Sequence, residues 1–190
     1  MKNNKRLVLA SASPRRREIL SGAGFGFSVR ATDVDEALPP DLTPEEAVQY
    51  LAKIKNNAVG LNGGEVCVSA DTVVVCDKKI LGKPTDAEDA RRMLKMLSDR
   101  SHFVYTGVCI RDAEKQNVFF EKTEVFFYPL IDEEIDGYVE SGEPMDTAGA
   151  YGIQGKAALF VRKIDGDYLN VVGLPLARLA RELKKFGLFT

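Results

Sequence analysis

The feature that most constrains this chain is the stretch VCVSADTVVVC at residues 66–76, the strongest β-strand signal in the sequence. It consists of two apolar runs that are separated by the small and polar residues Ser-Ala-Asp-Thr at 69–72. We expect the first run to form a strand that ends just before Asp71, and DKKI at 77–80 to turn back into a short strand. The stretch therefore predicts a buried strand with a carboxylate at its end.

Strand and helix signals alternate along the rest of the chain. Further strands are expected at 7–11, 27–32, 103–111 and 117–128, and in a hairpin over 159–172 that turns at Asp165-Gly166-Asp167. Helices are expected from Ser13-Pro14, from Thr43-Pro44, and over 85–99, 131–141 and 174–187. A serine before proline, and Thr-x-x-Glu capping boxes at Thr43 and Thr85, mark the first three helix starts.

Antiparallel hairpins interrupt this alternation, so the pattern predicts an α/β fold with a mixed twisted sheet flanked by helices. A length of 190 residues suits one domain, with two lobes around a cleft as one arrangement. Apolar runs such as ALFV are too short to span a bilayer, and no apolar signal segment follows MKNNKR. We therefore expect a cytoplasmic protein.

Charge and rare residues narrow the classes of function. The formal net charge is −2, whereas general nucleic-acid binders are usually basic, so any affinity for anions must be local. The three cysteines lie in apolar surroundings without CxxC spacing, which favours buried, inert thiols. His102 is the only histidine, so a metal site built from several imidazoles is excluded.

The segment LVLASASPRRREIL at 7–20 runs from a strand into a helix that opens with positive charge. A helix N-terminus favours anions, because its backbone N–H groups are unpaired and its dipole is positive there. Arg15 and Arg16 fall in that first turn, and Ser11 and Ser13 add hydroxyl donors. Guanidinium groups bind phosphate oxygens in a bidentate fork, so a polyphosphate is the natural ligand. The alternative is a set of solvated arginines on a helix surface.

Asp71 is a second candidate, because a carboxylate beside an apolar strand is costly to bury without a partner. A divalent metal would solve this problem, with Asp35 and Glu36 of the acidic loop DVDE as sources of further oxygens. The alternative is a structural salt bridge between Asp71 and Lys83 of LGKP, across the expected hairpin.

The third candidate is the segment GAYGIQG at 149–155. Its glycines permit a close backbone approach or a positive φ. Tyr151 can stack on a base, and Gln154 can donate to and accept from a base edge. The alternative is a plain glycine-rich turn.

Together these segments resemble the Maf family of nucleotide pyrophosphatases. LASASPRRREIL, SADTVV, LGKP, GAYGIQG and NVVGLP stand in the family's order and approximate spacing, over nearly the whole chain. EPMDTAGAYGIQG resembles the branch that prefers dTTP and UTP rather than the branch associated with 7-methyl-GTP. The resemblance implies one catalytic domain over 1–190, with a central cleft and a fold similar to inosine triphosphate pyrophosphatases.

The resemblance also implies an activity. The substrate would be dTTP, UTP or a modified pyrimidine nucleotide, hydrolysed between the α and β phosphates to the monophosphate and pyrophosphate. A divalent metal, Mg²⁺ or Mn²⁺, would assist. The family further suggests a homodimer and a role in house-cleaning or in the inhibition of septum formation.

Roles are carried over by motif. Asp71 is the proposed proton acceptor, or it positions the metal, and Lys83 and Arg16 are further catalytic candidates. The metal ligands would be Asp71 and Glu36. The substrate-binding candidates are Ser11, Ser13, Arg15, Lys55, Thr72 and Gln154. In LAKIKNN, Lys53 is an alternative to Lys55.

Two other classes compete with a hydrolase. A non-catalytic nucleotide sensor of cell division would use the same phosphate site, but it would gain little from a carboxylate that faces phosphates. A nucleic-acid-binding module would need a broad basic face with aromatic residues, whereas this chain is net acidic and its arginine runs are short.

Overall fold

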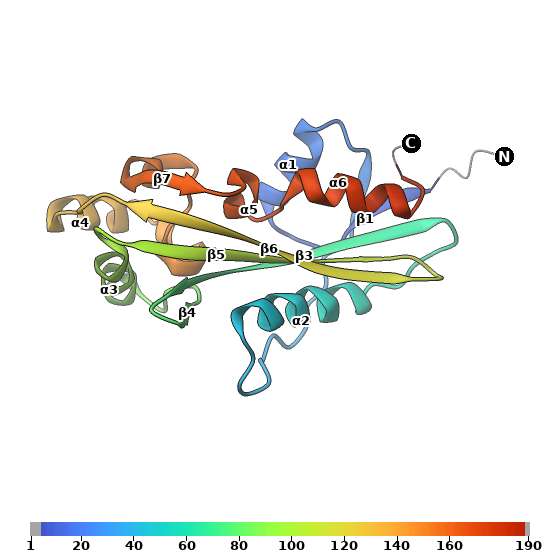
Figure 1. Ribbon diagram of the computed structural model, residues 1–190, viewed down its shortest axis with the longest axis horizontal. Coiled ribbons are helices and arrows are strands. Elements are labelled where there is room, and N and C mark those ends of the chain that lie inside the picture. The colour runs from blue at the N-terminus through green and yellow to red at the C-terminus, as the bar shows by residue number, and fades with distance from the viewer. Residues whose placement is uncertain (1–4, 189–190) are drawn as a thin grey trace. The chain divides into compact units, whose positions relative to one another are not determined.

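The computed structural model describes residues 5–188, in which seven strands form one mixed sheet (Figure 1). The strands are β1 Arg6–Leu9, β2 Phe27–Val29, β3 Glu65–Cys76, β4 Lys79–Leu81, β5 Ser101–Arg111, β6 Gln116–Phe127 and β7 Val161–Asp165. Their order is β2-β1-β3-β5-β6-β7, and β4 pairs with β3. β1 runs parallel to β2 and β3, whereas β4 and β7 run antiparallel to their partners. The predicted mixed α/β sheet is confirmed.

The helices begin largely where the capping signals place them. They are α1 Pro14–Gly22, α2 Pro44–Asn57, α3 Ala87–Leu97, α4 Asp132–Glu140, α5 Tyr168–Val172 and α6 Leu176–Lys185, with short 3-10 helices η1 Glu143–Asp146, η2 Ala148–Ala150 and η3 Gly155–Phe160. Ser13 caps α1, and Thr43 and Glu46 form both hydrogen bonds of a capping box on α2. The sequence predictions for these two helix starts are confirmed.

Two local predictions are wrong for identifiable reasons. α3 is capped by Asp86, whose Oδ1 accepts from the backbone N–H of Asp89 at 2.8 Å, and not by the predicted box of Thr85 and Glu88. The second arm of the expected hairpin after β7 is the short helix α5, because the Asp167 carboxylate accepts from the N–H of Leu169 and turns the chain.

β3 also differs from its prediction, since it continues unbroken from Glu65 to Cys76. Ser69 and Asp71 therefore lie inside the strand, and the expected end before Asp71 is wrong. Alternate residues of a strand share a face, so these two side chains point the same way. Ser69 Oγ donates to the carbonyl of Ala52 in α2 at 2.6 Å, and Asp71 pairs with Lys55 of the same helix. The strand continues because α2 satisfies the polar groups that seemed to interrupt it.

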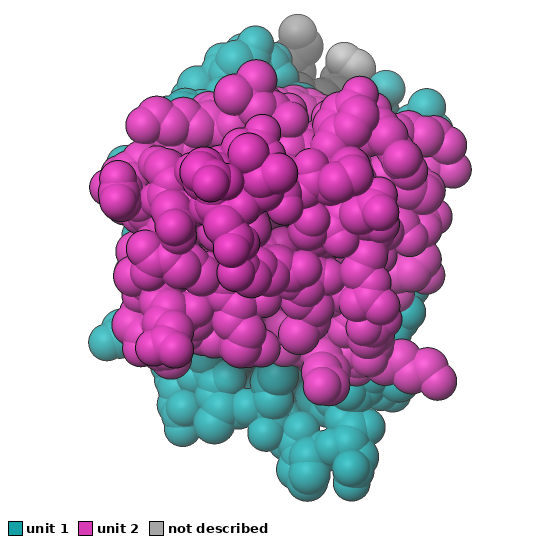
Figure 2. Space-filling view, turned by 90° about the vertical axis from the view of Figure 1, so that its left-hand side faces the viewer, with its two compact units in different colours: residues 1–71, 106–121, 173–190 teal, residues 72–105, 122–172 magenta. Residues whose placement is uncertain are grey.

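The residues fall into two compact units (Figure 2). Unit 1 comprises residues 1–71, 106–121 and 173–190, and unit 2 comprises 72–105 and 122–172. α1, α2 and α6 belong to unit 1, whereas β4, β7, α3, α4 and α5 belong to unit 2. β3, β5 and β6 each contribute residues to both units. None of the helices within residues 5–188 has the length and apolar character needed to cross a bilayer.

The cysteines are free and buried, as the sequence predicts. Burial raises the pKa of Cys67 to about 11 and that of Cys109 to about 12, and it also raises the pKa of Cys76. A thiol reacts as its thiolate. Unreactive thiols are therefore the expectation at neutral pH.

In unit 1, α2 lies close against β5 at Gly107. Ala47, Val48, Leu51 and Ala52 of the helix are buried in this contact layer. A Cβ atom at position 107 would overlap the backbone carbonyl of Val48 and come within 2.7 Å of the backbone nitrogen of Gln49. Glycine at 107 therefore permits the close packing that brings α2, and Lys55 with it, onto the sheet.

We predict that Gly107→Ala destabilises the protein by about 3 kcal/mol, because the added methyl group overpacks a backbone contact. Gly137→Ala is the matched control, since a Cβ there meets nothing within 4 Å in the exposed face of α4. That control should stabilise by about 0.5–1 kcal/mol, because alanine favours a helix over glycine. Urea denaturation of both variants measures the difference. Equal stabilities would contradict the packing argument.

Candidate active site

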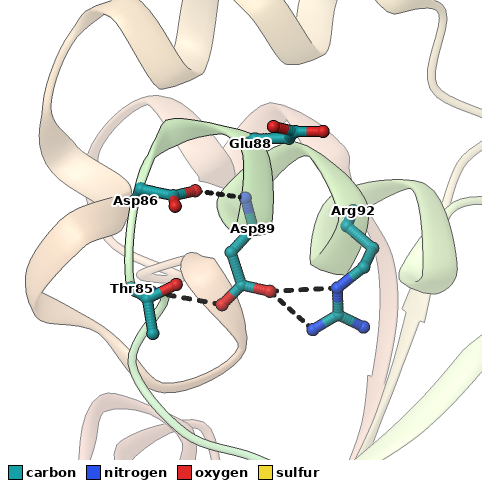
Figure 3. Close-up of a pocket in the computed structure, with 5 residues that line it drawn as sticks. All are labelled: Thr85, Asp86, Glu88, Asp89 and Arg92. Atoms are coloured by element: carbon teal, nitrogen blue, oxygen red, sulfur yellow. Dashed lines mark hydrogen bonds and ion pairs between the residues drawn. The ribbon is translucent and has the colours of Figure 1, made fainter.

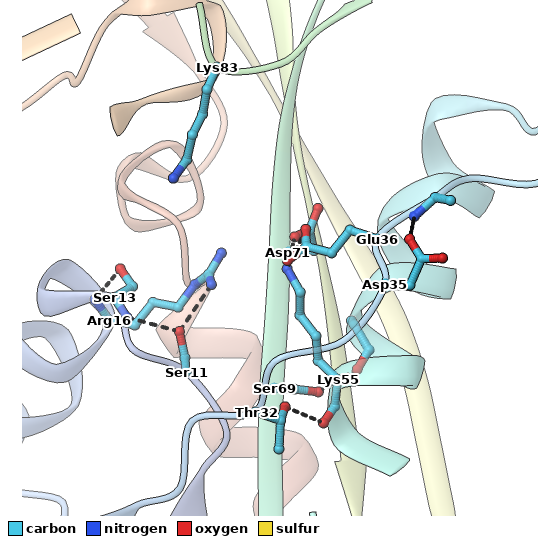
Figure 4. Close-up of polar contacts among 12 residues, drawn as sticks. Ser11, Ser13, Arg16, Thr32, Asp35, Glu36, Lys55, Ser69, Asp71 and Lys83 are labelled. Carbon is cyan, nitrogen blue, oxygen red and sulfur yellow. Dashed lines mark hydrogen bonds and ion pairs between the residues drawn. The ribbon is translucent and has the colours of Figure 1, made fainter. Parts of the chain in front are cut away.

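The segment after β1 forms a compact polar turn at the start of α1 (Figure 4). Ser11 Oγ accepts from the backbone N–H of Ser13 and from Nη1 of Arg16, both at 3.2 Å. Arg16 Nε donates to the carbonyl of Gly173 at 2.9 Å, which links this turn to the NVVGLP segment. These contacts fix the Arg16 guanidinium in place, and they bring the first and last of the five motifs together.

The charge of Arg16 is balanced within unit 1. The pKa of Arg16 is lowered, mainly by burial and also by the positive charge of Arg15. The negative charges of Asp71 and Glu36 act in the opposite direction and raise it. An arginine nevertheless remains protonated at neutral pH. The first turn of α1 therefore carries two guanidinium groups at a helix N-terminus, within electrostatic range of two carboxylates. This is the arrangement that a polyphosphate with bound cations would complement.

Lys55, on the last turn of α2, joins the two carboxylates. Its Nζ lies 2.6 Å from Asp71 Oδ1 and 3.0 Å from Glu36 Oε2. The side chains of Lys55 and Asp71 are only 15% and 13% exposed, whereas that of Glu36 is 55% exposed. Lys53, the alternative in the same helix, is exposed. Lys55 therefore supplies the counter-charge that a buried carboxylate needs, and it also pairs with the more exposed Glu36 of the loop.

The partner of Asp71 corrects a sequence interpretation. The alternative of a salt bridge between Asp71 and Lys83 is wrong, because Asp71 pairs with Lys55 and Lys83 pairs with Asp146. The hairpin of β3 and β4 suggested Lys83 because it is close in sequence. Lys55 lies sixteen residues before Asp71, and only the packing of α2 on β3 brings it there.

The oxygens of Asp71 and Glu36 suit a divalent cation. Figure 4 shows Glu36 pointing toward Asp71, whereas Asp35 points away and accepts from the N–H of Ala37 at 3.0 Å. Among residues 5–188, no group of three or more His, Cys, Asp or Glu side chains is placed to hold a metal. Mg²⁺ commonly takes one or two protein carboxylates and completes its shell with water and substrate phosphates. The two carboxylates fit that mode of binding, and not a closed protein cage.

The acidic loop that carries Glu36 is anchored at its base. Arg30, just after β2, donates from both Nη atoms to the two carboxylate oxygens of Glu65, at 2.7 and 2.6 Å. Arg30 also donates to the carbonyl of Gly60, and its own N–H donates to Leu9. The Arg30 hydrogen bond and a backbone N–H from Asn62 lower the pKa of Glu65 to about 2. This bidentate pair fixes the point from which the loop departs.

Unit 2 gathers the other motif residues. The N–H of Gly149 donates to the carbonyl of Gly82 at 2.9 Å, so the GAYGIQG and LGKP segments are hydrogen-bonded to each other. A Cβ on Gly149 would come within 2.9 Å of the Val74 side chain in β3. Thr72 shares a face of β3 with Val74, because alternate strand residues point the same way. The face of β3 that carries Thr72 therefore packs against the GAYGIQG segment.

Lys83 and Gln154 are on the surface of unit 2. Lys83 pairs with Asp146 in an ion pair whose side chains are 64% and 82% exposed. Gln154 is exposed and has extended backbone angles, between the buried residue Ile153 and Gly155. Gly149 and Ala150 both adopt positive φ, at 69° and 61°. The expected positive φ of the glycine-rich segment is confirmed, and it extends to an alanine.

The sequence matches the family model described as "Maf-like protein" over residues 6–186. The chain belongs to the Maf family. Curated relatives include proteins named dTTP/UTP pyrophosphatase from Geobacillus sp. (strain WCH70), 52% identical over 96% of this chain and 99% of the relative, and from Bacillus pumilus (strain SAFR-032), 50% identical over 96% and 97%. Among solved structures, a HAM1 protein from Coxiella burnetii is similar in fold, with a TM-score of 0.50, 16% identity, and coverage of 95% of this chain and 99% of that one.

This Maf-family chain also has a surface pocket at the start of α3 (Figure 3). It is lined by Thr85, Asp86, Glu88, Asp89 and Arg92. Asp89 accepts there from the N–H of Thr85 at 3.1 Å and from Arg92 Nε at 3.0 Å. These contacts cap the helix, so we assign the pocket no part in the candidate site.

Sequence reasoning missed two residues that support the site. Asn56 is fully buried and donates to the carbonyls of Cys67 and Cys109, at 3.2 and 2.8 Å, which ties the end of α2 to two strands. Glu65 holds Arg30, as described above. The available sequence signal for Asn56 was its spacing, because it follows Val48 and Ala52 at intervals of four and so falls on the apolar face of the helix. No local signal identifies the partner of Glu65.

We predict that Glu65→Gln makes the protein less stable at pH 7 and makes its stability less sensitive to acid. The Glu65 pKa is about 2 in the folded protein, against an ordinary value of 4.5, so the unfolded chain binds more protons between these pH values. The stabilisation is present above pH 4.5 and is lost as pH falls toward 2. Urea midpoints at pH 7, 4.5 and 3 measure the effect. Parallel pH profiles for the two proteins would contradict it.

Proposed function

We propose that this chain is a metal-dependent nucleoside triphosphate pyrophosphatase that converts dTTP and UTP to the monophosphate and pyrophosphate. The observation that carries the proposal is the largely buried carboxylate of Asp71, paired with Lys55 at 2.6 Å and within electrostatic range of Arg16. The curated relatives support it, because proteins named dTTP/UTP pyrophosphatase share about half of their residues with this chain over nearly its full length.

The phosphate groups would bind at the start of α1. Arg15 and Arg16 supply guanidinium forks, and the dipole of α1 is positive at this end of the helix. Ser11 and Ser13 already organise this turn, with Ser11 Oγ holding Arg16. A hydroxyl that fixes an arginine reduces the conformational freedom that the arginine loses on binding. The turn is therefore preorganised for a polyphosphate.

Asp71 would act on the water that hydrolyses the α–β anhydride. As the water oxygen bonds to phosphorus, its proton passes to Asp71, the bridging P–O bond breaks, and pyrophosphate leaves. Asp71 serves the same reaction if it instead holds the cation in position. Lys55 supplies the counter-charge of Asp71 before the reaction, with its Nζ 2.6 Å from Oδ1.

Asp71 and Glu36 would hold the divalent cation, Mg²⁺ or Mn²⁺. When bound, the cation neutralises phosphate charge and activates water. Lys55 pairs with both of these carboxylates, and its Nζ is within 3.0 Å of each. The proposal therefore includes a rearrangement in which Lys55 shares these carboxylates with the cation.

Unit 2 would supply recognition of the base and further charge. Gln154 can donate to and accept from a pyrimidine edge, and Thr72 lies on the strand face that packs against the same segment. Lys83 would stabilise the departing pyrophosphate. Its present partner, Asp146, is exposed, and exposed ion pairs contribute little, so a phosphate can displace it at small cost.

We predict that, with Mg²⁺ or Mn²⁺, the protein releases monophosphate and pyrophosphate from dTTP and UTP faster than from other nucleoside triphosphates. A panel of canonical and modified nucleotides, with products separated by ion-exchange chromatography, measures this. Release of diphosphate and orthophosphate would contradict the cleavage position. Nucleotide binding without turnover would contradict the proposed enzymatic activity, and it would favour the non-catalytic sensor.

We predict that Asp71→Asn lowers kcat by about 10²–10⁴-fold, the contribution that a positioned general base or a lost cation ligand makes. The matched control is Asp136→Asn. It removes a carboxylate of α4 that pairs with Arg91 of α3. Nucleotide affinity of the Asp71 variant, measured by calorimetry, should persist, because the arginines are intact. Wild-type turnover by Asp71→Asn would overturn the mechanism.

A further inference from the structure

A buried polar pair in unit 2 takes no part in the proposed chemistry. His102 Nε2 and the hydroxyl of Tyr151 are 2.7 Å apart, within hydrogen-bonding distance. Both rings belong to an aromatic cluster that also contains Phe127, Phe160 and Tyr138. The Tyr151 ring stands edge-on to both His102 and Phe127, with ring centroids 5.3 and 4.8 Å away. The two polar residues are only 1% and 4% exposed. His102 is also the only histidine of the chain.

This environment keeps the imidazole neutral. Burial lowers the pKa of His102 to about 3, and its other ring nitrogen, Nδ1, has no hydrogen-bond partner within the described part of the chain. A protonated ring would need acceptors for two N–H groups. The His102 ring is therefore uncharged at neutral pH, and its polar contact is the hydrogen bond to Tyr151.

Apolar packing alone does not require a hydrogen bond between His102 and Tyr151. Two phenylalanines would fill the same space without burying polar atoms, and replacing both partners of a buried hydrogen bond by apolar groups is often nearly neutral. The pair therefore adds orientation rather than packing. It fixes where the Tyr151 ring and its backbone sit along the face of the aromatic cluster.

Tyr151 is the middle anchor of the GAYGIQG segment. The hydroxyl of Tyr138 accepts from the N–H of Gly152 at 3.3 Å, and Tyr151 and Ile153 are buried. Tyr151 and Gln154 have extended backbone angles. Gln154, directly after the buried Ile153, is exposed. The position of Gln154 thus depends on how Tyr151 is held, three residues before it.

We propose that His102 is a positioning residue for nucleotide selection: it holds the Tyr151 hydroxyl and thereby sets the position of Gln154. This inference rests on the proposed function, in which Gln154 reads the pyrimidine edge. It adds a residue from the middle of the chain that touches no substrate. The determinants of selectivity then extend from the surface loop to the aromatic cluster beneath it.

A double-mutant cycle tests the proposal. His102→Phe should lower kcat/KM for dTTP about tenfold, mainly through KM, a smaller loss than the ~10²-fold that a full 1 Å misplacement can cause. It should also reduce the preference for dTTP over dGTP. If His102 acts through Gln154, then His102→Phe adds almost nothing in a Gln154→Ala background. Additive losses, or an unchanged KM and preference in His102→Phe, would overturn it.

A second variant separates positioning from stability. His102→Phe alone leaves the Tyr151 hydroxyl buried without its partner, which destabilises the fold. His102→Phe combined with Tyr151→Phe should recover the melting temperature, because both polar groups are gone. The selectivity defect should remain in the double variant. Recovery of selectivity together with stability would show a purely structural role and overturn the proposal.

The single histidine permits a direct readout that does not depend on turnover. In protein labelled with ¹⁵N-histidine, the ring signals should show one neutral tautomer from pH 5 to 8. They should shift on addition of α,β-imido-dTTP, and the shift should be lost in Gln154→Ala. An unresponsive ring in a protein that binds this analogue would overturn the positioning role. Absence of dTTP hydrolysis by the wild-type protein, with the ring responding normally, would instead refute only the proposed function.

Discussion

The pairing of Asp71 with Lys55 is the interaction on which the rest of the candidate site depends. A carboxylate in the interior of a strand is costly without a counter-charge, and removing one partner of a buried ion pair commonly costs about 3–5 kcal/mol. Lys55 reaches Asp71 only because α2 lies close on the sheet, and this approach requires glycine at position 107. The same approach satisfies Ser69 through Ala52. One helix contact therefore allows β3 to remain continuous and keeps a charged carboxylate at its centre.

The electrostatics of unit 1 follow from that arrangement. Arginines in the first turn of a helix are unfavourable to the helix itself, by about 0.3–1 kcal/mol each. In this protein Asp71 and Glu36 offset part of the cost for Arg16, and Ser11 and Gly173 hold its guanidinium. Lys55 in turn offsets the two carboxylates. Cations and carboxylates are thus interleaved, so that the substrate and the cation of the proposed function would each meet groups of opposite charge.

The sequence predicted correctly those features that depend on residues close together in the chain. The Ser13 cap, the Thr43 capping box, the β3–β4 hairpin and the mixed sheet follow from residues within a few positions of one another. The errors arose where distant groups decide. The polar break in β3 is removed by α2, and the assignment of Lys83 to Asp71 fails because Lys55 arrives from another element. Family motifs named the residues of the candidate site, but they gave no indication of Glu65 or His102, whose partners are 35 and 49 residues away.

The motif residues divide between the two units in a chemically consistent way. Unit 1 holds most of the charged groups of the proposed reaction, Arg15, Arg16, Lys55, Glu36 and Asp71, whereas unit 2 holds Lys83 and the proposed groups of base recognition, Thr72 and Gln154. Asp71 and Thr72, which are neighbours in β3, belong to different sets. Each set has its own internal support: ion pairs and serine hydroxyls in unit 1, and backbone hydrogen bonds with an aromatic cluster in unit 2. The ion pairs of unit 1 and the aromatic cluster of unit 2 share no residue, so under the proposed function a substitution that alters base preference would leave Asp71, Lys55 and Arg16 intact.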